Sequence, residues 1–398
     1  MITVSQNTDE REVIRIKRII LFIAAAAAVF AFSVEVYAAS DENDLSEVYK
    51  SQFEAADISS LLSGLPEETR ESLASAGIGL DTDSTPQLPD TGRLLSQAAE
   101  MLASGSRTPL CGFTVCFGII ILCSMTEGFG IGASEKRLQT VQNTAATMCI
   151  CAAVIVPLCA TIQRASQVIS GAAGFMLIYA PVMAGLLSGS GHTSGAASYY
   201  TAMLTAGNAV SLLSSRLIIP MMNVFLALSV TSSVSPKMQL GSLCETVYKT
   251  AKWALTLVMS VFITVLSLNS IITSSMDSVT KRVLRFTVSS FTPVVGGVLS
   301  EALSAFNGSL ELLRSGAGVF VIIASAFILL PVLFESILWQ LSLFALAAVA
   351  DISGISRIAC VFRTVSKAAA MLTALLLCTL TVFVISTVIV LLAYRGQG

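Results

Sequence analysis

Uninterrupted apolar runs constrain this chain more than any other feature of its sequence. Ala369–Leu392 has no charged residue over 24 positions, and Trp253–Ile272 has none over 20. A run of about 18 such residues is long enough to cross the hydrocarbon core of a bilayer as a helix. Only 12% of all residues are charged and 54% are hydrophobic, whereas soluble domains carry about 25% charged residues. The sequence therefore predicts an all-α, polytopic α-helical membrane protein.

Interruptions within the apolar runs divide the chain into about seven predicted spans. Arg164 indicates a tight turn between two of them, and Glu335 indicates the turn of a hairpin. Ser198–Val230 is too long for one untilted span and contains Arg216 and Pro220, so it forms either two segments or one broken helix. The apolar segments are Leu110–Met125, Thr144–Ile162, Val168–Leu187, Ser198–Val230, Trp253–Ile272, the hairpin Ala317–Phe334 with Ile337–Val349, and Ala369–Leu392.

The first 109 residues have the pattern of an export signal followed by a polar segment. Residues 1–38 combine a basic start, the apolar run Ile19–Phe32 and a small-residue cleavage site, as a secretory signal peptide does. The alternative is an uncleaved membrane anchor, since Ile19–Val34 is almost long enough to span. In both cases residues 39–109 are predicted to be a short, acidic, extracytoplasmic helical segment. It serves either as a docking platform for an extracytoplasmic partner or as a partly ordered spacer.

Charge is distributed unevenly between this outer segment and the rest of the chain. Residues 39–109 hold 13 acidic and 4 basic side chains, a net charge of −9, which repels nucleic acid. Residues 110–398 hold 8 acidic and 15 basic side chains, a net charge of +7. The basic segment Asp351–Lys367 fits a cytoplasmic connection, because cytoplasmic loops of membrane proteins are enriched in lysine and arginine. We expect the lipid bilayer, and no nucleic acid, as a partner.

The sequence shows no pattern typical of an enzyme. Its single histidine, His192, lies in a Gly/Ser-rich connector, and the neighbouring serines lack the G-x-S-x-G context of a nucleophile turn. With one histidine and no C-x-x-C there is no zinc-type spacing, and no P-loop motif occurs. The nine cysteines are most simply small apolar packing residues. We therefore expect no catalytic residue, no cofactor and no metal site.

A broken, charged stretch within the bundle 110–398 is the strongest candidate for function. Thr280–Ile323 opens with a basic cluster, is broken at a proline and a glycine pair, and carries charges before the next apolar run. Such a segment at membrane depth is tolerated only where protein or a water-filled cavity surrounds it, so we expect a broken internal helix at 280–316. The alternative is that its charges reach the interface and its prolines are plain kinks. The residues predicted to act as intramembrane functional or contact residues are Arg216, Pro293, Gly296, Gly297, Glu301, Glu311 and Arg314.

The same stretch resembles the stage III sporulation protein AE family of endospore-forming bacteria. The resembling pattern is K-R-x-x-R-F from Lys281, then F-x-P-V-V-G-G-x-L-S-E-A-L over Phe291–Leu303, followed by a charged helix and a G-x-G entry into a span. The resemblance extends over most of the chain in its layout of signal sequence, acidic outer segment and several spans.

This resemblance implies a role in the channel that joins the mother cell to the engulfed forespore. The protein is then expected in the mother-cell membrane, as a scaffold or conduit needed for late forespore gene expression. The partners it implies are other proteins of the same sporulation operon, including an ATPase, and a forespore channel partner, in an oligomeric assembly. The alternative is a stand-alone secondary transporter for a small solute, although the sequence lacks the internal repeat on which many transporters are built.

Overall fold

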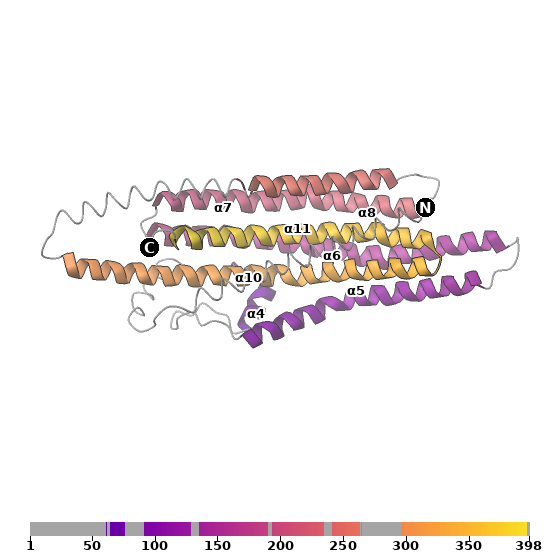
Figure 1. The fold of residues 1–398 in the computed structure, drawn as a ribbon, viewed down its shortest axis with the longest axis horizontal. Coiled ribbons are helices and arrows are strands. Elements are labelled where there is room, and N and C mark those ends of the chain that lie inside the picture. The colour runs from indigo at the N-terminus through magenta and orange to yellow at the C-terminus, as the bar shows by residue number, and fades with distance from the viewer. Residues whose placement is uncertain are drawn as a thin grey trace.

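The computed structural model describes residues 61, 64–75, 91–128, 135–189, 193–234, 241–262, 264 and 296–395. These residues form an elongated bundle of long helices that run nearly parallel to one axis (Figure 1). No strand occurs within the described ranges, and the prediction of an all-α membrane protein is confirmed. The predicted signal peptide lies outside the described residues.

Long helices make up almost all of the described chain, and most are longer than one membrane span requires. Their bounds are α4 Glu67–Ser75, α5 Thr91–Gly128, α6 Glu135–Gly189, α7 Thr193–Leu213, a π-helical segment Ser214–Ile218, α8 Ile219–Val234, α10 Gly296–Ile352 and α11 Ser356–Arg395. Residues 241–262 form a further helix between α8 and α10.

A tight turn joins α10 to α11 and sends the chain back along itself. Gly354 has a φ of +81°, which only glycine adopts without strain. Its N–H donates to the carbonyl oxygen of Asp351 at 3.1 Å, and the N–H of Ile355 donates to that of Ala350 at 3.0 Å. This is the Schellman pattern of hydrogen bonds that ends helices at a left-handed glycine. Consequently α10 and α11 form an antiparallel pair, and the predicted connection Asp351–Lys367 shrinks to three residues, 353–355.

Two of the predicted turns are wrong. Arg164 lies inside α6, and Glu335 lies inside α10, so two pairs of predicted spans each form one helix. The physical reason is that these two side chains form an ion pair with each other at 2.5 Å. A charge that finds its partner within the bundle does not have to reach water through a turn.

Five helices of the described chain are long and apolar enough to cross a membrane. The protein is therefore a multi-pass membrane protein. The candidate spans are Ala99–Met125, Thr144–Leu186, Tyr199–Ser232, Phe320–Ile352 and Ser356–Thr387. The predicted outer segment 39–109 and the predicted span Leu110–Met125 meet inside α5, which continues through Pro109. The predicted span Trp253–Ile272 is helical at residues 253–262 and 264, and its other residues lie outside the described ranges.

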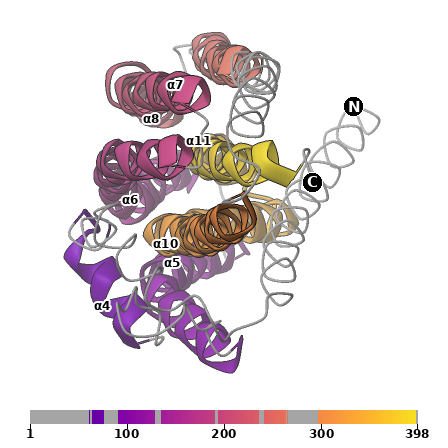
Figure 2. The ribbon, with the colours of Figure 1, turned by 90° about the vertical axis from the view of Figure 1, so that its left-hand side faces the viewer.

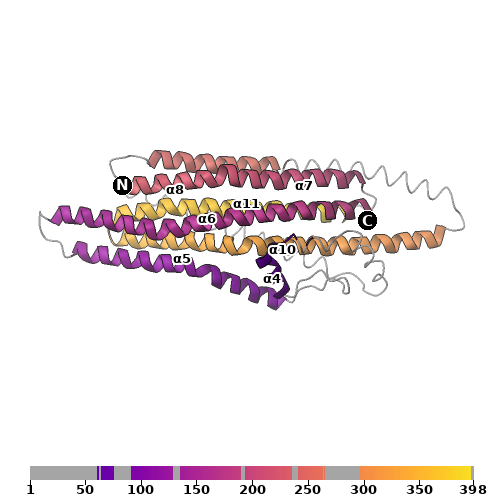
Figure 3. The ribbon, with the colours of Figure 1, turned by 180° about the vertical axis from the view of Figure 1, so that it is seen from behind.

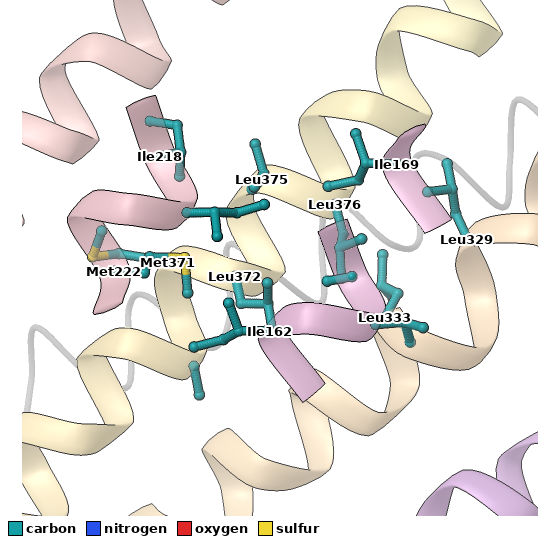
Figure 4. Packing of buried hydrophobic residues seen from close by; sticks show 14 of the residues in the cluster. Ile162, Ile169, Ile218, Met222, Leu329, Leu333, Met371, Leu372, Leu375 and Leu376 are labelled. Carbon is teal, nitrogen blue, oxygen red and sulfur yellow. The ribbon is translucent and has the colours of Figure 1, made fainter. Parts of the chain in front are cut away.

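The core of the bundle lies where α6, α10 and α11 meet. Seen from one end, α10 and α11 occupy the middle, with α5 on one side and α7 and α8 on the other (Figure 2). Buried aliphatic side chains of α6, α8, α10 and α11 interlock there (Figure 4). Ile162 of α6, Leu333 of α10 and Leu372 of α11 are each at most 3% exposed. This packing fixes the relative depth of the helices and so decides which polar side chains can meet.

Part of the acidic segment 39–109, which is predicted to lie outside the cytoplasm, packs on the side of this bundle. Leu65 and Leu73 are buried, and α4 contacts α10. A Cβ atom on Gly64 would lie 2.5 Å from the Cδ1 atom of Ile178, so the chain approaches α6 closely at this glycine. The described part of the outer segment is therefore anchored on the bundle.

Candidate functional site

The predicted interruption of Ser198–Val230 is present as a π-helical turn. α7 runs into the π-helical segment Ser214–Ile218 and continues as α8, so the region is one interrupted helix. Arg216 lies in this turn, near the middle of the candidate span Tyr199–Ser232. π-helical turns are rare and occur frequently at functional sites. Among the predicted contact residues that the structure describes, Arg216 therefore has the most distinctive backbone.

Arg216 belongs to a line of exposed polar side chains on one face of α7 and α8. Asn208, Arg216 and Asn223 are all exposed and follow one another at about two helical turns. None of them has a hydrogen bond or ion pair with any residue that the structure describes. The exposed threonines of the same face differ, because Thr201 and Thr205 donate back to carbonyl oxygens of their own helix at 2.9 and 2.8 Å. We call Asn208, Arg216 and Asn223 the open polar face.

A second polar centre lies inside the bundle, between α6 and α10. The Glu335 side chain is 2% exposed. Its Oε1 atom accepts hydrogen bonds from Arg164 Nη2 at 2.5 Å and from Thr161 Oγ1 at 2.8 Å. The Arg164 side chain is 49% exposed and reaches inward from the surface of α6. The carboxylate is thus neutralised from one side only, by a side chain of a single neighbouring helix.

Prolines precede both halves of this polar centre. Pro157 lies four residues before Thr161 in α6, and Pro331 lies four residues before Glu335 in α10. A proline inside a helix removes one N–H donor and leaves the carbonyl oxygen four residues earlier without its usual partner. Thr161 Oγ1 lies 3.1 Å from the Pro157 carbonyl oxygen as well, and its one hydrogen can serve either this oxygen or the carboxylate. The centre therefore combines a buried charge with two locally weakened helices.

Close packing of α5 covers the same centre. A Cβ atom on Gly105 would lie 3.6 Å from the carbonyl oxygen of Pro331 and 3.9 Å from the Cβ atom of Glu335. One on Gly112 would lie only 2.7 Å from the ring of Trp339, which is 1% exposed. These two glycines let α5 approach α10 at the level of the carboxylate.

On its other side the centre continues to α11 through hydroxyl groups. The Ser336 and Thr373 hydroxyl oxygens are 2.7 Å apart. Thr373 Oγ1 also donates to the carbonyl oxygen of Ala369 at 3.0 Å. Polar groups of α6, α10 and α11 thus lie at one depth of the bundle, with apolar packing above and below.

A third group of charges lies near the turn end of the bundle. Lys367 of α11 donates to Glu245 Oε2 at 3.1 Å, and Lys249 lies 3.6 Å from Glu245 Oε1. The hydrogen bond from Lys367 is the largest cause that lowers the pKa of the Glu245 carboxyl below its ordinary value. The Lys367 ammonium also lies 5.8 Å from the centre of the Tyr248 ring. Glu245 and Lys249 lie outside the candidate spans, and Lys367 precedes the uncharged run Ala369–Leu392, so we call these charges the interfacial cluster.

The remaining predicted contact residues lie at the start of α10 or before it. α10 is continuous from Gly296 onward, through Gly297, Glu301, Glu311 and Arg314. Its N-terminal turns extend beyond the ends of α6, α7 and α11 (Figures 1 and 3). Pro293 and the rest of 280–295 lie outside the described residues, so the predicted break stays a prediction.

The sequence did not predict the pairing of Arg164 with Glu335. The two residues are 171 positions apart, and a single sequence shows no link over that distance. One signal was available: each charge follows a proline within an otherwise apolar run. In the part of the chain that the structure describes, no three histidine, cysteine or acidic side chains gather as they would to hold a metal.

Comparison with known proteins places these features in a family. The family model described as Stage III sporulation protein AE matches residues 114–393. The chain belongs to this family. It is 24% identical over 185 residues to the Stage III sporulation protein AE of Bacillus subtilis (strain 168), an alignment that covers 46% of each chain. The alignment thus spans about half the length of that curated relative. No solved structure matches the chain.

The range that matches the stage III sporulation protein AE family includes the open polar face and the buried polar centre around Glu335. Arg164, Arg216 and Glu335 all lie between residues 114 and 393, whereas the acidic outer segment lies before them. The family description names a stage of sporulation and no catalysed reaction. The chain is accordingly a multi-pass membrane protein of a sporulation family.

Proposed function

We propose that this protein is a membrane component of the channel complex that joins the mother cell to the forespore, and that it is needed for late forespore gene expression. It acts there as a scaffold or conduit and not as an enzyme. Its partners are other proteins of the same sporulation operon, including an ATPase, and a forespore channel protein. Membership of the sporulation family supports the process, and the open polar face supports the role within an assembly.

The exposure of Arg216 is the observation that carries this proposal. An arginine at the centre of a membrane helix costs about 2.5–3.5 kcal/mol on insertion scales, so such residues face protein or a water-filled cavity. Arg216 has no ion pair among the described residues, and its side chain is exposed on the outside of the bundle. Asn208 and Asn223 extend the same face, and asparagine side chains form hydrogen bonds between membrane helices. This face has no partner among the described residues, and in our proposal another chain or the water of a conduit fills that role.

The length of the bundle supports the same conclusion. Thr144–Leu186 has 43 residues, which is about 65 Å of helix, whereas the hydrocarbon core is about 30 Å thick. Fitting the whole run into one bilayer would require a tilt of roughly 60°, beyond the range of about 0–40° seen for membrane helices. Part of this apolar surface therefore needs a cover other than lipid, which neighbouring proteins of an assembly supply.

The alternation of the helices gives the orientation that we propose. α10 ends where α11 begins, and the charges of Lys249, Arg357, Arg363 and Lys367 gather towards this turn end. Short cytoplasmic loops are enriched in lysine and arginine, so the turn end faces the mother-cell cytoplasm. The end of α11 lies at the opposite end, and α5 begins near the middle of the long axis (Figure 1). The acidic outer segment and the C-terminus are then both extracytoplasmic.

The substitution Arg216→Leu tests the assembly role. It removes a charge that nothing in the described bundle pairs, so protein level and membrane insertion should stay as in the wild type. We expect the variant to bind the operon partners about tenfold more weakly, the effect expected for losing hydrogen bonds from a charged group. It should also lower expression of a late forespore reporter.

Thr201→Leu is the matched control for this experiment, because its hydroxyl lies on the same exposed face but is already bonded to Ala197. It should leave both readouts unchanged. Normal partner binding and normal reporter expression in Arg216→Leu would overturn the proposed role of this face. Normal sporulation after deletion of the whole gene would overturn the proposed function itself.

A further inference from the structure

A pocket opens between α8, the helix of residues 241–262 and α11, near the turn end of the bundle. Its volume is about 230 Å³, slightly below the roughly 300–1,000 Å³ of pockets that hold drug-sized ligands. Basic and hydroxyl side chains line it, together with Cys360 and Phe225. A space of this size, with charged and hydroxyl side chains in its wall, suits a small charged group.

Two basic side chains give the pocket a positive charge. Arg357 and Lys367 both line it, and Glu245 is the acidic residue among the lining side chains. Glu245 is already held by Lys367 at 3.1 Å and Lys249 at 3.6 Å. Its single negative charge is thus more than balanced, and the pocket with its rim keeps an excess of positive charge.

Arg357 is the cation without a partner. It forms no ion pair or hydrogen bond with the residues that the structure describes, whereas Arg363, further along α11, pairs with Asp351. Arg357 also lies in the first turn of α11, where the helix dipole disfavours a positive charge. The hydroxyl of Ser232, on the opposite wall, is likewise unbonded within the described residues. Two free donors therefore face a cavity that nothing in the described chain fills.

The position of the pocket indicates that its ligand comes from the membrane. α11 is charged from Arg357 to Lys367 and then has no charged residue until Arg395, so the pocket lies where the polar end of the bundle meets its apolar part. In the orientation proposed above, this end faces the cytoplasm. Basic pockets between membrane helices on the cytoplasmic side bind the head groups of anionic lipids. We propose that this pocket binds the phosphate group of an anionic phospholipid, with Arg357 as its principal donor.

Lipid titration of the purified full-length protein in a neutral detergent tests the proposal. Phosphatidylglycerol and phosphatidylcholine with the same acyl chains are added, and bound lipid is counted by native mass spectrometry. The wild type should bind phosphatidylglycerol in preference. Arg357→Gln should weaken that binding about tenfold, the effect expected for losing hydrogen bonds from a charged group. Cys360→Trp, which fills the pocket and leaves its charges in place, should weaken it as well.

Arg363→Gln is the control, since this residue lies on the same helix but does not line the pocket. It should bind phosphatidylglycerol as the wild type does. Equal losses in Arg357→Gln and Arg363→Gln, or equal binding of both lipids by the wild type, would overturn the proposal. A rise in melting temperature with inorganic phosphate or glycerol phosphate that matches the rise with phosphatidylglycerol would assign the pocket to a soluble phosphate and overturn the lipid source.

Discussion

Arg164 and Arg216 both lie inside apolar helices, yet their surroundings differ completely. Arg164 reaches from the surface of α6 to a carboxylate that is 2% exposed, and both charges are matched within one chain. Arg216 lies on a π-helical turn, is exposed, and has no partner among the described residues. The first arginine has its ion-pair partner within the bundle, whereas the second has none among the described residues. Arg164 thus stabilises the fold of the chain itself, whereas Arg216 is the residue that we propose contacts another molecule.

Breaking the internal pair should give the largest change in stability. Arg164→Leu leaves a buried, unpaired carboxylate at Glu335, and such a loss costs about 3–5 kcal/mol of unfolding free energy. The double variant Arg164→Leu with Glu335→Leu should recover to within about 1 kcal/mol of the wild type, since apolar replacements of a buried pair are often neutral. Denaturant unfolding of the protein in detergent measures both.

A matched ion pair at the surface provides the control. Arg363 pairs with Asp351, and both side chains are at least 36% exposed. Arg363→Leu should change the unfolding free energy by less than about 1 kcal/mol, as exposed ion pairs usually do. If Arg164→Leu cost no more than this control, the internal pair would not be holding α6 to α10.

A smaller effect is expected where α5 covers the buried carboxylate. Gly112→Leu forces a side chain against the Trp339 ring, which a Cβ atom alone would approach to 2.7 Å. Overpacking of this kind costs about 1–3 kcal/mol. Gly118→Leu, in the same helix, meets nothing within 4 Å of its Cβ position and should leave the unfolding free energy unchanged or raise it. Similar unfolding curves for the two variants would show that α5 is not closely packed at this level.

The smallest effect should come from the interfacial pair of Glu245 and Lys367. Because the pKa of Glu245 is lowered from 4.5 in the folded state, its contribution is complete above that ordinary value and is lost as the pH falls through the lowered one. Lys367→Gln removes the main cause, so the fall in stability below about pH 4.5 should become shallower. The difference should be under about 1 kcal/mol, because the partners are well exposed. Melting temperatures measured between pH 3 and 7 test this; an unchanged profile would contradict the assigned cause.

Some of these features could be predicted from the sequence alone, and others could not. An apolar run too long for one span, with Arg216 and Pro220 inside it, was enough to predict the interruption that the π-helical turn confirms. The same reasoning placed turns at Arg164 and Glu335, where it failed. A charge within an apolar run has two physical outcomes, a turn to water or a partner within the bundle, and only the three-dimensional packing distinguishes them. The contact of Gly112 with Trp339 was invisible for the same reason, because it joins positions 227 residues apart.

The length of α10 has a mechanical consequence. With 57 residues it is a rod of about 85 Å, nearly three times the thickness of the hydrocarbon core of about 30 Å. A tilt of about 5° moves one end of such a rod by about 7 Å relative to the other. The polar centre around Glu335 lies in the part of the rod nearer the α11 turn, beside a proline, and the charged turns of Glu301 and Glu311 form its far arm. A shift of a few ångströms at the end near the α11 turn would thereby reach the far end of α10 as a larger displacement, without any change of fold.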